Sequence, residues 1–288
     1  MHQPRWCLRS VVAGVAAVWF ALVPSAFAQQ RPLTTEDPEP VGAGRLLVES
    51  GFDYAWAATY PVSGLQGGLL RLPLVGISVG ISSIAELQID GGLFNRLSIT
   101  ERQSAPLSDM VTATGPTTSS VEDIVFATKV RVVSETSGRP SFGMRFATKL
   151  PTASNESGLG LDTTDFYVSG LIGKTIRSTR TVFNVGFGIL GDPTRGDRQN
   201  DVLTYGVSFA RALTNRSELV GEVNGRLDTR EGEPPPGTGS RGVARLGARY
   251  TAGAWRADGG VLFGLTTDDP SFGVIGGFTY VFSAFQVP

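Results

Sequence analysis

The chain has almost none of the residues that carry thiol, imidazole or metal chemistry. Its single cysteine, Cys7, and its single histidine, His2, both lie within the first ten residues. Once that end is removed on export, neither group remains, which excludes disulfides, Cys/His metal sites and every His-dependent triad. We therefore expect no catalytic residue, no metal site and no cofactor, and predict that the protein is not an enzyme.

Residues 1–28 have the pattern of a secretory signal peptide. Arg5 and Arg9 precede an apolar run over residues 11–23, and Ala26 and Ala28 form an A-x-A cleavage site. The run is shorter than the ~20 residues that a transmembrane helix needs. The sequence thus predicts cleavage after residue 28 and secretion to the periplasm, with an uncleaved membrane anchor as the weaker alternative.

An excess of positive charge is also lacking. The sequence has 25 Lys and Arg against 26 Asp and Glu, and two of the arginines belong to the predicted signal peptide. The mature chain is therefore slightly acidic and lacks the basic excess typical of nucleic-acid binding, so we expect no nucleic-acid partner. Glycine is instead abundant, with 37 residues, and no helical period is evident. These features favour one large all-β domain.

From residue 44 onward, apolar and polar residues alternate in twelve segments of about ten residues. A tilted strand of about 9–11 residues crosses a bilayer. The segments are Arg45–Trp56, Leu69–Val79, Ile84–Leu93, Glu122–Val133, Ser141–Leu150, Asp165–Ile176, Thr181–Leu190, Asp201–Ala212, Ser217–Leu227, Gly242–Tyr250, Trp255–Leu265 and Phe272–Phe282.

The connections between these segments alternate in length. Long ones are expected over 57–68, 94–121, 151–164, 191–200 and 228–241, and short ones over 80–83, 134–140, 177–180, 213–216 and 251–254; the last, 266–271, is no longer than the short class. Bacterial outer-membrane barrels have an even strand number, short periplasmic turns and long external loops. We predict a transmembrane antiparallel up-and-down β-barrel of about 12 strands over residues 44–288, in the outer membrane of a Gram-negative bacterium. A secreted soluble β-sandwich or barrel is the alternative.

Residues 29–43 contain Pro32, Pro38 and Pro40 and are not expected to form a barrel strand. Two interpretations stay open for them. The segment is either a periplasmic N-terminal tail, which is the favoured interpretation, or a short plug that reaches into the lumen.

The last predicted strand ends on an aromatic residue, Phe282, with Phe285 close behind. Such a strand is typical of barrels that the barrel-assembly machinery inserts, so we expect that machinery as a partner, together with outer-membrane lipid and lipopolysaccharide. Asp268 and Asp269 could contact lipopolysaccharide through a bridging cation, although a solvated turn is the commoner role for such a pair.

The two faces of the predicted strands differ in chemistry. In Ser141–Leu150, for example, Phe142 and Phe146 oppose Arg145 and Lys149. The apolar face is expected to contact lipid, because Arg or Lys at mid-bilayer costs about 2–4 kcal/mol. The charged residues that this parity places in the lumen are Glu49, Asp53, Arg71, Glu86, Asp90, Asp123, Lys129, Arg131, Arg145, Lys149, Asp165, Glu218, Glu222, Arg226, Arg245, Arg249, Arg256 and Asp258.

Acids and bases are balanced in this set, and two interpretations follow. The charges either pair across the lumen and close the barrel, or line a wet channel with segregated signs that suits small polar or zwitterionic solutes. Twelve strands lie between the filled and the open regimes of barrel size. A narrow or gated channel is favoured over a closed barrel.

The segment from Val121 to Thr152 reads VEDIVFATKVRVVSETSGRPSFGMRFATKLPT, with an acidic start, a K-x-R strand and a strand ending K-L-P-T. Together with the opening RPLTTEDP at residues 31–38 and the motifs around Gly158, Asp192 and Asn224, it resembles a family of bacterial outer-membrane transporter barrels labelled as proteins of the meta-pathway of phenol degradation. The resemblance covers most of the mature chain. It implies an outer-membrane barrel involved in uptake of small aromatic or hydrophobic compounds, and it carries no binding residue.

Three functions remain open at this stage. The first is a passive channel for small solutes, with selectivity set by the charged lumen and gating by the long loops. The second is a closed structural or adhesion barrel whose external loops bind a partner. The third is a transporter of hydrophobic compounds with a lateral opening, which would need an apolar patch in the lumen.

Overall fold

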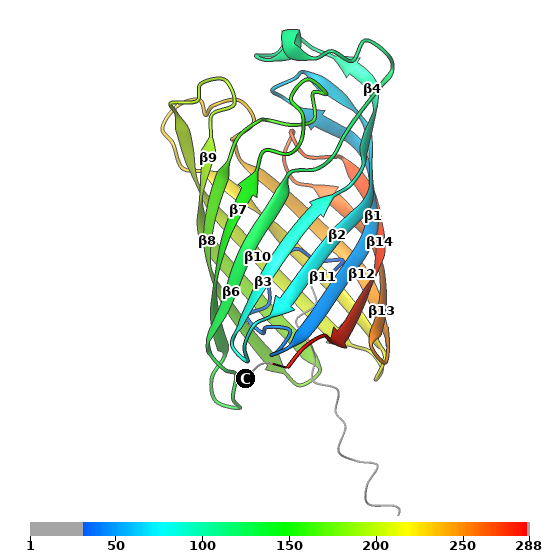
Figure 1. Cartoon of the computed structure of the whole chain (residues 1–288), viewed down its shortest axis with the longest axis vertical. Helices are drawn as coiled ribbons and strands as arrows, with labels where there is room; N and C mark the ends of the chain where they lie inside the picture. The colour runs from blue at the N-terminus through cyan, green and yellow to red at the C-terminus, as the bar shows by residue number, and fades with distance from the viewer. Residues whose placement is uncertain (1–30, 287–288) are drawn as a thin grey trace, which may run out of the picture.

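The computed structural model describes residues 31–286, and the predicted signal peptide lies outside them. These residues form one antiparallel sheet that closes on itself, because β1 pairs with both β14 and β2 (Figure 1). The elements are β1 (Arg45–Tyr60), β2 (Leu65–Gly80), β3 (Ala85–Gly92), β4 (Asn95–Arg102), η1 (Ser108–Met110), β5 (Thr117–Ser120), β6 (Ile124–Val133), β7 (Ser141–Leu150), β8 (Asp165–Ile176), β9 (Thr179–Gly191), β10 (Gln199–Ala212), β11 (Ser217–Asp228), β12 (Arg241–Ala252), β13 (Trp255–Gly264) and β14 (Phe272–Ser283).

Four of these elements make two interrupted strands, so the barrel has twelve. Both β3 and β4 pair with β2, one with each half of it. Across the interruption, β4 pairs with β5 in the register by which β3 pairs with β6, as the pairs Asn95–Ser120 and Asp90–Val125 show. The predicted closed antiparallel barrel of about twelve strands is confirmed.

The predicted strands agree closely with the observed ones, and two predicted loops were wrong. Residues 57–68 are mostly strand, because β1 continues to Tyr60 and β2 resumes at Leu65. Residues 94–121 contain β4, η1 and β5 rather than a plain loop. In β4, Leu97 is buried while Arg96 and Ser98 are exposed. This alternation continues the strand beyond the break at residues 93–94.

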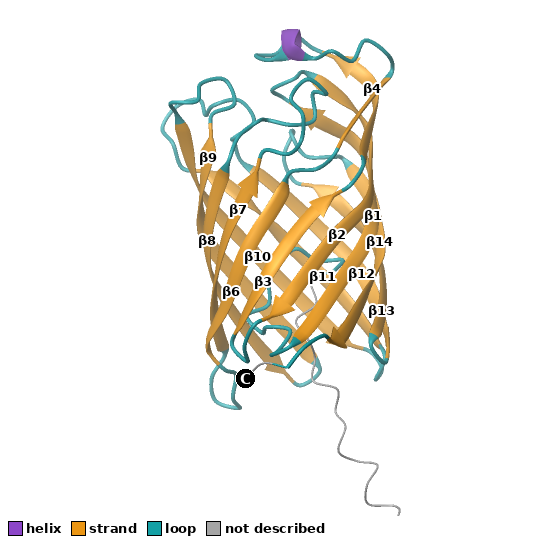
Figure 2. Cartoon of the chain, in the orientation of Figure 1, coloured by secondary structure: helices purple, strands orange, loops and turns teal. Residues whose placement is uncertain are grey.

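The two ends of the barrel differ, as Figure 2 shows. The end that carries the connections 103–116, 151–164, 192–198 and 229–240 is called the long-loop end. The opposite end, with the turns 81–84, 213–216 and 253–254, is called the short-turn end. Phe285 lies at this end, because its backbone N–H donates to the carbonyl of Gly44, and the N–H of Gly44 donates to Gly80 at the end of β2. In residues 31–286 no helix is long and apolar enough to span a membrane.

The outer surface of the wall is apolar, and the inner surface is polar. Phe187 and Val185 on β9 are 63% and 56% exposed, whereas Asn200, Glu222 and Lys129 are buried. A soluble protein would bury its aromatic residues, so this inverted arrangement is typical of a barrel surrounded by lipid. The ionisable side chains of the wall therefore face the lumen, where they contact one another and the N-terminal segment.

Candidate functional site

The N-terminal segment, residues 31–43, lies inside the barrel and crosses its lumen. Arg31 begins the path near β13 and β14, where its Nη2 donates to the carbonyl of Gly276 at 2.8 Å. Thr34 then meets β11, Glu36 meets β6 and β7, and Val41 meets β3. The segment therefore contacts strands all around the wall before the chain enters β1.

Two glycines allow the segment to lie close to the wall. A Cβ atom on Gly143 or Gly173 would stand 3.1 Å from an atom of the Pro38 ring. Side chains at these positions of β7 and β8 would push Pro38 away. The abundance of glycine on the inner face thus has a packing role beside the segment.

Glu222 of β11 binds the segment through several hydrogen bonds. Its carboxylate accepts from the backbone N–H of Thr34 at 2.9 Å, from that of Thr35 at 2.8 Å and from the Thr34 hydroxyl at 3.1 Å. Arg245 of β12 donates to the same carboxylate at 2.7 Å. A carboxylate with this many donors holds the segment strongly, because bonds to charged groups are worth about 1.5–3 kcal/mol each.

Glu36 is the most heavily partnered acid of the segment. Its Oε2 lies 3.2 Å from Lys129 Nζ and its Oε1 lies 3.0 Å from Arg145 Nε. Asn184 of β9 accepts from the Glu36 N–H and donates to its carbonyl. Burial alone would raise the pKa of Glu36, but the cations of Lys129 and Arg145 outweigh it and lower the pKa below its usual 4.5.

Three further contacts lie on the short-turn side of Glu36. Asp37 forms a bidentate pair with Arg180 of β9, with distances of 2.7 and 2.8 Å. Glu39 pairs with Arg131 of β6. The backbone N–H of Val41 donates to Glu86 of β3 at 2.6 Å. These contacts tie the second half of the segment to the opposite wall from that bound by Arg31.

The predicted lumen residues form pairs mainly between neighbouring strands rather than across the lumen. Glu222 faces Arg245 in the strand register, and Glu218 faces Arg249. The remaining pairs of this kind are Arg71–Asp53 (2.6 Å), Lys129–Glu86 (2.9 Å), Lys149–Asp165 (2.9 Å) and Lys149–Asp123 (3.2 Å). Two longer pairs, Arg145–Asp90 (3.6 Å) and Arg256–Glu218 (3.7 Å), reach past one intervening strand. Contacts that cross the lumen run through the N-terminal segment.

Three predicted lumen residues have other partners. Glu49 accepts from the Thr279 hydroxyl at 3.0 Å, and Asp258 lies 3.6 Å from Arg31 Nε. Arg226 donates to the backbone carbonyls of Gly237 and Gly239 in the loop 229–240, and it makes no ion pair with the described carboxylates. It is therefore the one predicted lumen base without an ion pair among residues 31–286.

Three adjoining cavities of about 510, 500 and 340 Å³ lie on the long-loop side of the segment, and Tyr167 lines all of them. Together they are called the vestibule. Residues 31–34 and Glu36 line its floor. A fourth cavity of about 420 Å³, lined by Asp37, Glu39 and Arg180, lies on the short-turn side. It shares no lining residue with the vestibule, because the segment stands between them.

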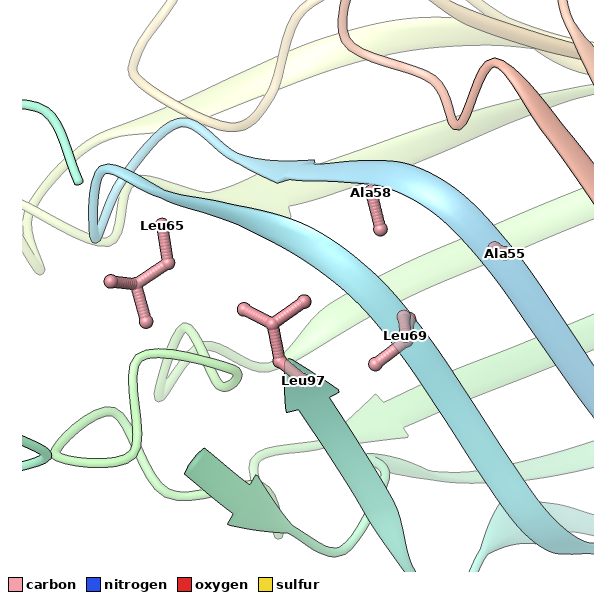
Figure 3. Close-up of a cluster of buried hydrophobic side chains, with 5 residues drawn as sticks. All are labelled: Ala55, Ala58, Leu65, Leu69 and Leu97. Atoms are coloured by element: carbon pink, nitrogen blue, oxygen red, sulfur yellow. The ribbon is translucent and has the colours of Figure 1, made fainter. Parts of the chain in front are cut away.

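One wall of the vestibule is apolar. A cluster of buried side chains from β1, β2 and β4 lies at the long-loop end, and Figure 3 shows Ala55, Ala58, Leu65, Leu69 and Leu97 in it. Ala55, Ala58 and Leu69 also line the 500 Å³ cavity, which faces charged residues on its other side. The vestibule is therefore amphipathic.

The alternation of inward and outward residues along the strands did not identify several residues of this region. The acids of the N-terminal segment were missed because no strand pattern places them, although Glu36, Asp37 and Glu39 are visible in the sequence. Asp269, expected in a solvated turn, is buried instead. It accepts from the Gly242 N–H and from the N–H and hydroxyl of Thr266, so it fixes the loop before β14.

No family model matches this chain, and no curated protein matches it. Among solved structures, it is similar to an outer-membrane channel from Pseudomonas putida F1, with a TM-score of 0.62 and 10% identity over 85% of this chain and 98% of that one. It is also matched to the translocator domain of the autotransporter NalP from Neisseria meningitidis, with a TM-score of 0.43 and 13% identity over 84% of this chain and 87% of that one. The first likeness supports the barrel fold.

Proposed function

We propose that this protein is an outer-membrane channel for small solutes and that residues 31–43 act as a plug that closes its lumen. The observation that carries the proposal is the separation of the vestibule from the short-turn cavity. The segment lines both the vestibule and the short-turn cavity, and these two spaces share no lining residue. Its displacement would join them into one path.

The direction of the barrel follows from its ends. Long loops face outward and short turns face the periplasm in outer-membrane barrels, so the vestibule would open to the outside. The matched Pseudomonas putida protein is described as an outer membrane channel, which supports the same role here. The apolar wall of the vestibule and the resemblance to phenol meta-pathway barrels favour small aromatic or hydrophobic compounds as solutes.

A lateral exit through the wall has less support. Every neighbouring pair of strands in the described barrel is hydrogen-bonded, and pairing across the β3–β4 interruption keeps its register. A solute would therefore pass along the axis. The N-terminal segment, rather than a gap between strands, is the part that has to move.

The test is conductance through the refolded protein from residue 29 onward in a planar bilayer. This chain has no cysteine, so a single introduced thiol is unique. Thr59 lines the 500 Å³ cavity, and Val185 lies on the outer face. We expect discrete openings, and a charged membrane-impermeant thiol reagent added at the long-loop side should reduce the current of T59C but not that of V185C.

Folding is checked independently by heat-modifiable gel mobility. Silence from folded protein, including a variant with a weakened plug, would refute the channel. It would instead favour the closed barrel whose external loops bind a partner.

A further inference from the structure

The vestibule contains a group of cations that the protein leaves partly uncompensated. Arg226 of β11 lies directly opposite Arg241 of β12 in the strand register. Like charges in directly opposite positions destabilise a sheet. Such a pair inside the lumen suggests that a negative group from outside is bound there.

The hydrogen bonds of Arg226 leave one side of its guanidinium free. Nε donates to the Gly239 carbonyl at 2.9 Å and Nη2 to the Gly237 carbonyl at 2.7 Å. Nη1 donates to none of the described residues, and Arg226 lines two of the vestibule cavities. Carbonyl dipoles anchor the loop, but they do not neutralise the charge.

Arg241 is compensated weakly as well. It donates to the Asp268 carbonyl, and its only ion pair among residues 31–286 is with Asp269 at 3.7 Å. The Asp269 carboxylate already accepts hydrogen bonds from Gly242 and Thr266 at 2.7–3.2 Å. These bonds all go to Asp269 Oδ2, whereas Arg241 faces Oδ1 at 3.7 Å, which is beyond hydrogen-bond distance. Asp269 therefore compensates Arg241 only through a long contact.

The other side of the same space is apolar. The cavity of about 500 Å³ that contains both arginines is also lined by Leu69, Leu159 and Leu262. This volume falls within the ~300–1,000 Å³ typical of small-molecule sites, which combine an apolar lining with few polar groups. Paired guanidinium groups bind carboxylates well because their N–H groups form a planar fork.

We propose that Arg226 and Arg241 form a subsite for the carboxylate of a small organic acid, whose apolar body lies against the leucine wall of the vestibule. The subsite deepens the proposed function, since it would be the first binding site on the path of the solute. Binding itself does not require the plug to move.

The test uses three probes on detergent-folded protein, namely benzoate, its neutral analogue benzamide, and acetate, which has the charge but almost no apolar body. Dissociation constants are measured by equilibrium dialysis. We expect benzoate to bind at least tenfold more tightly than either of the other two. R226Q should reduce benzoate affinity to that of benzamide, R241Q should reduce it severalfold, and R216Q, at an exposed site in the turn 213–216, should leave it unchanged.

Equal binding of benzoate and benzamide would overturn the proposal, as would R226Q that keeps full affinity. Equal binding of benzoate and acetate would show that the leucine wall does not contribute to binding, and would overturn that part of the proposal. Since R226Q also loses an anchor of the loop 229–240, R241Q serves as the second variant, and heat-modifiable gel mobility checks that both variants are folded. Bilayers without channel openings, together with selective benzoate binding, would refute the channel and support the subsite. Channel openings without selective benzoate binding would support the channel and refute the subsite.

Discussion

Replacing Glu36 by glutamine should loosen the plug while leaving the wall intact. Lys129 would keep Glu86 at 2.9 Å, and Arg145 would keep Gln88 at 2.8 Å and Asp90 at 3.6 Å. Hydrogen bonds to a charged group are worth about 1.5–3 kcal/mol and neutral ones about 0.5–1.5 kcal/mol. A glutamine side chain has one carbonyl oxygen, so it can accept from Lys129 or from Arg145 but not from both. Loss of one such bond should weaken docking of the segment by about 1.5–3 kcal/mol, or about 10- to 150-fold in the ratio of open to closed states.

The assay is open probability in a planar bilayer at pH 7, with wild type and E36Q at the same protein density. The matched control is E233Q, which removes a carboxylate from the exposed loop 229–240. E36Q should open far more often, with an unchanged single-channel conductance, and E233Q should match wild type. An E36Q protein that is folded and opens no more often than wild type would show that Glu36 does not hold the plug.

Three further predictions follow from the same contacts. The pKa of Glu36 is lowered from 4.5, so the carboxylate stabilises the docked segment fully above pH 4.5, and this stabilisation is lost only as the pH falls through the lowered pKa. In stepped-pH recordings, the open probability of the wild type should therefore stay constant from pH 7 to 5 and increase only below pH 4.5. An increase already at pH 6 would contradict this. K129M leaves Glu86 and Glu36 in the interior without their shared cation, and urea unfolding should show a loss of about 3–5 kcal/mol; an unchanged unfolding midpoint would argue against the network. V185R places a cation on the lipid face of β9, where it should cost about 2–4 kcal/mol of folding free energy in a bilayer, and equal stability with wild type would mean that lipid does not contact this face.

Most of the barrel could be predicted from the sequence because the pattern that marks each strand lies within the strand itself. Alternation of apolar and polar residues identified both ends of Ser141–Leu150 and of Asp165–Ile176 as they are observed. The strand Asn95–Arg102 was missed, because Gly91, Gly92 and the adjacent pair Leu93–Phe94 break the period before it. The extended pairing of β1 with β2 was also underestimated, since the tip 57–60 has little polar alternation.

The ion pairs were less predictable. Parity placed Glu222 and Arg245 on inward faces, but only the register of β11 with β12 decides that they lie side by side rather than across the lumen. A shift of the register by two residues would keep the same faces and exchange the partners. The equal numbers of acids and bases in the lumen therefore do not predict which side chains form ion pairs and which, like Arg226, do not.

The sequence by itself determined the all-β barrel, its approximate strand number, the inverted polarity of its two faces and the absence of thiol and imidazole groups beyond residue 7. These are properties of residue type and of a period of two along each strand. Only the tertiary structure decided where residues 31–43 lie. Their acids bind Lys129, Arg145 and Arg180, which are about 90 to 145 positions away in the chain. No local pattern encodes such contacts, because they exist only once the closed wall has brought its cations to face one space.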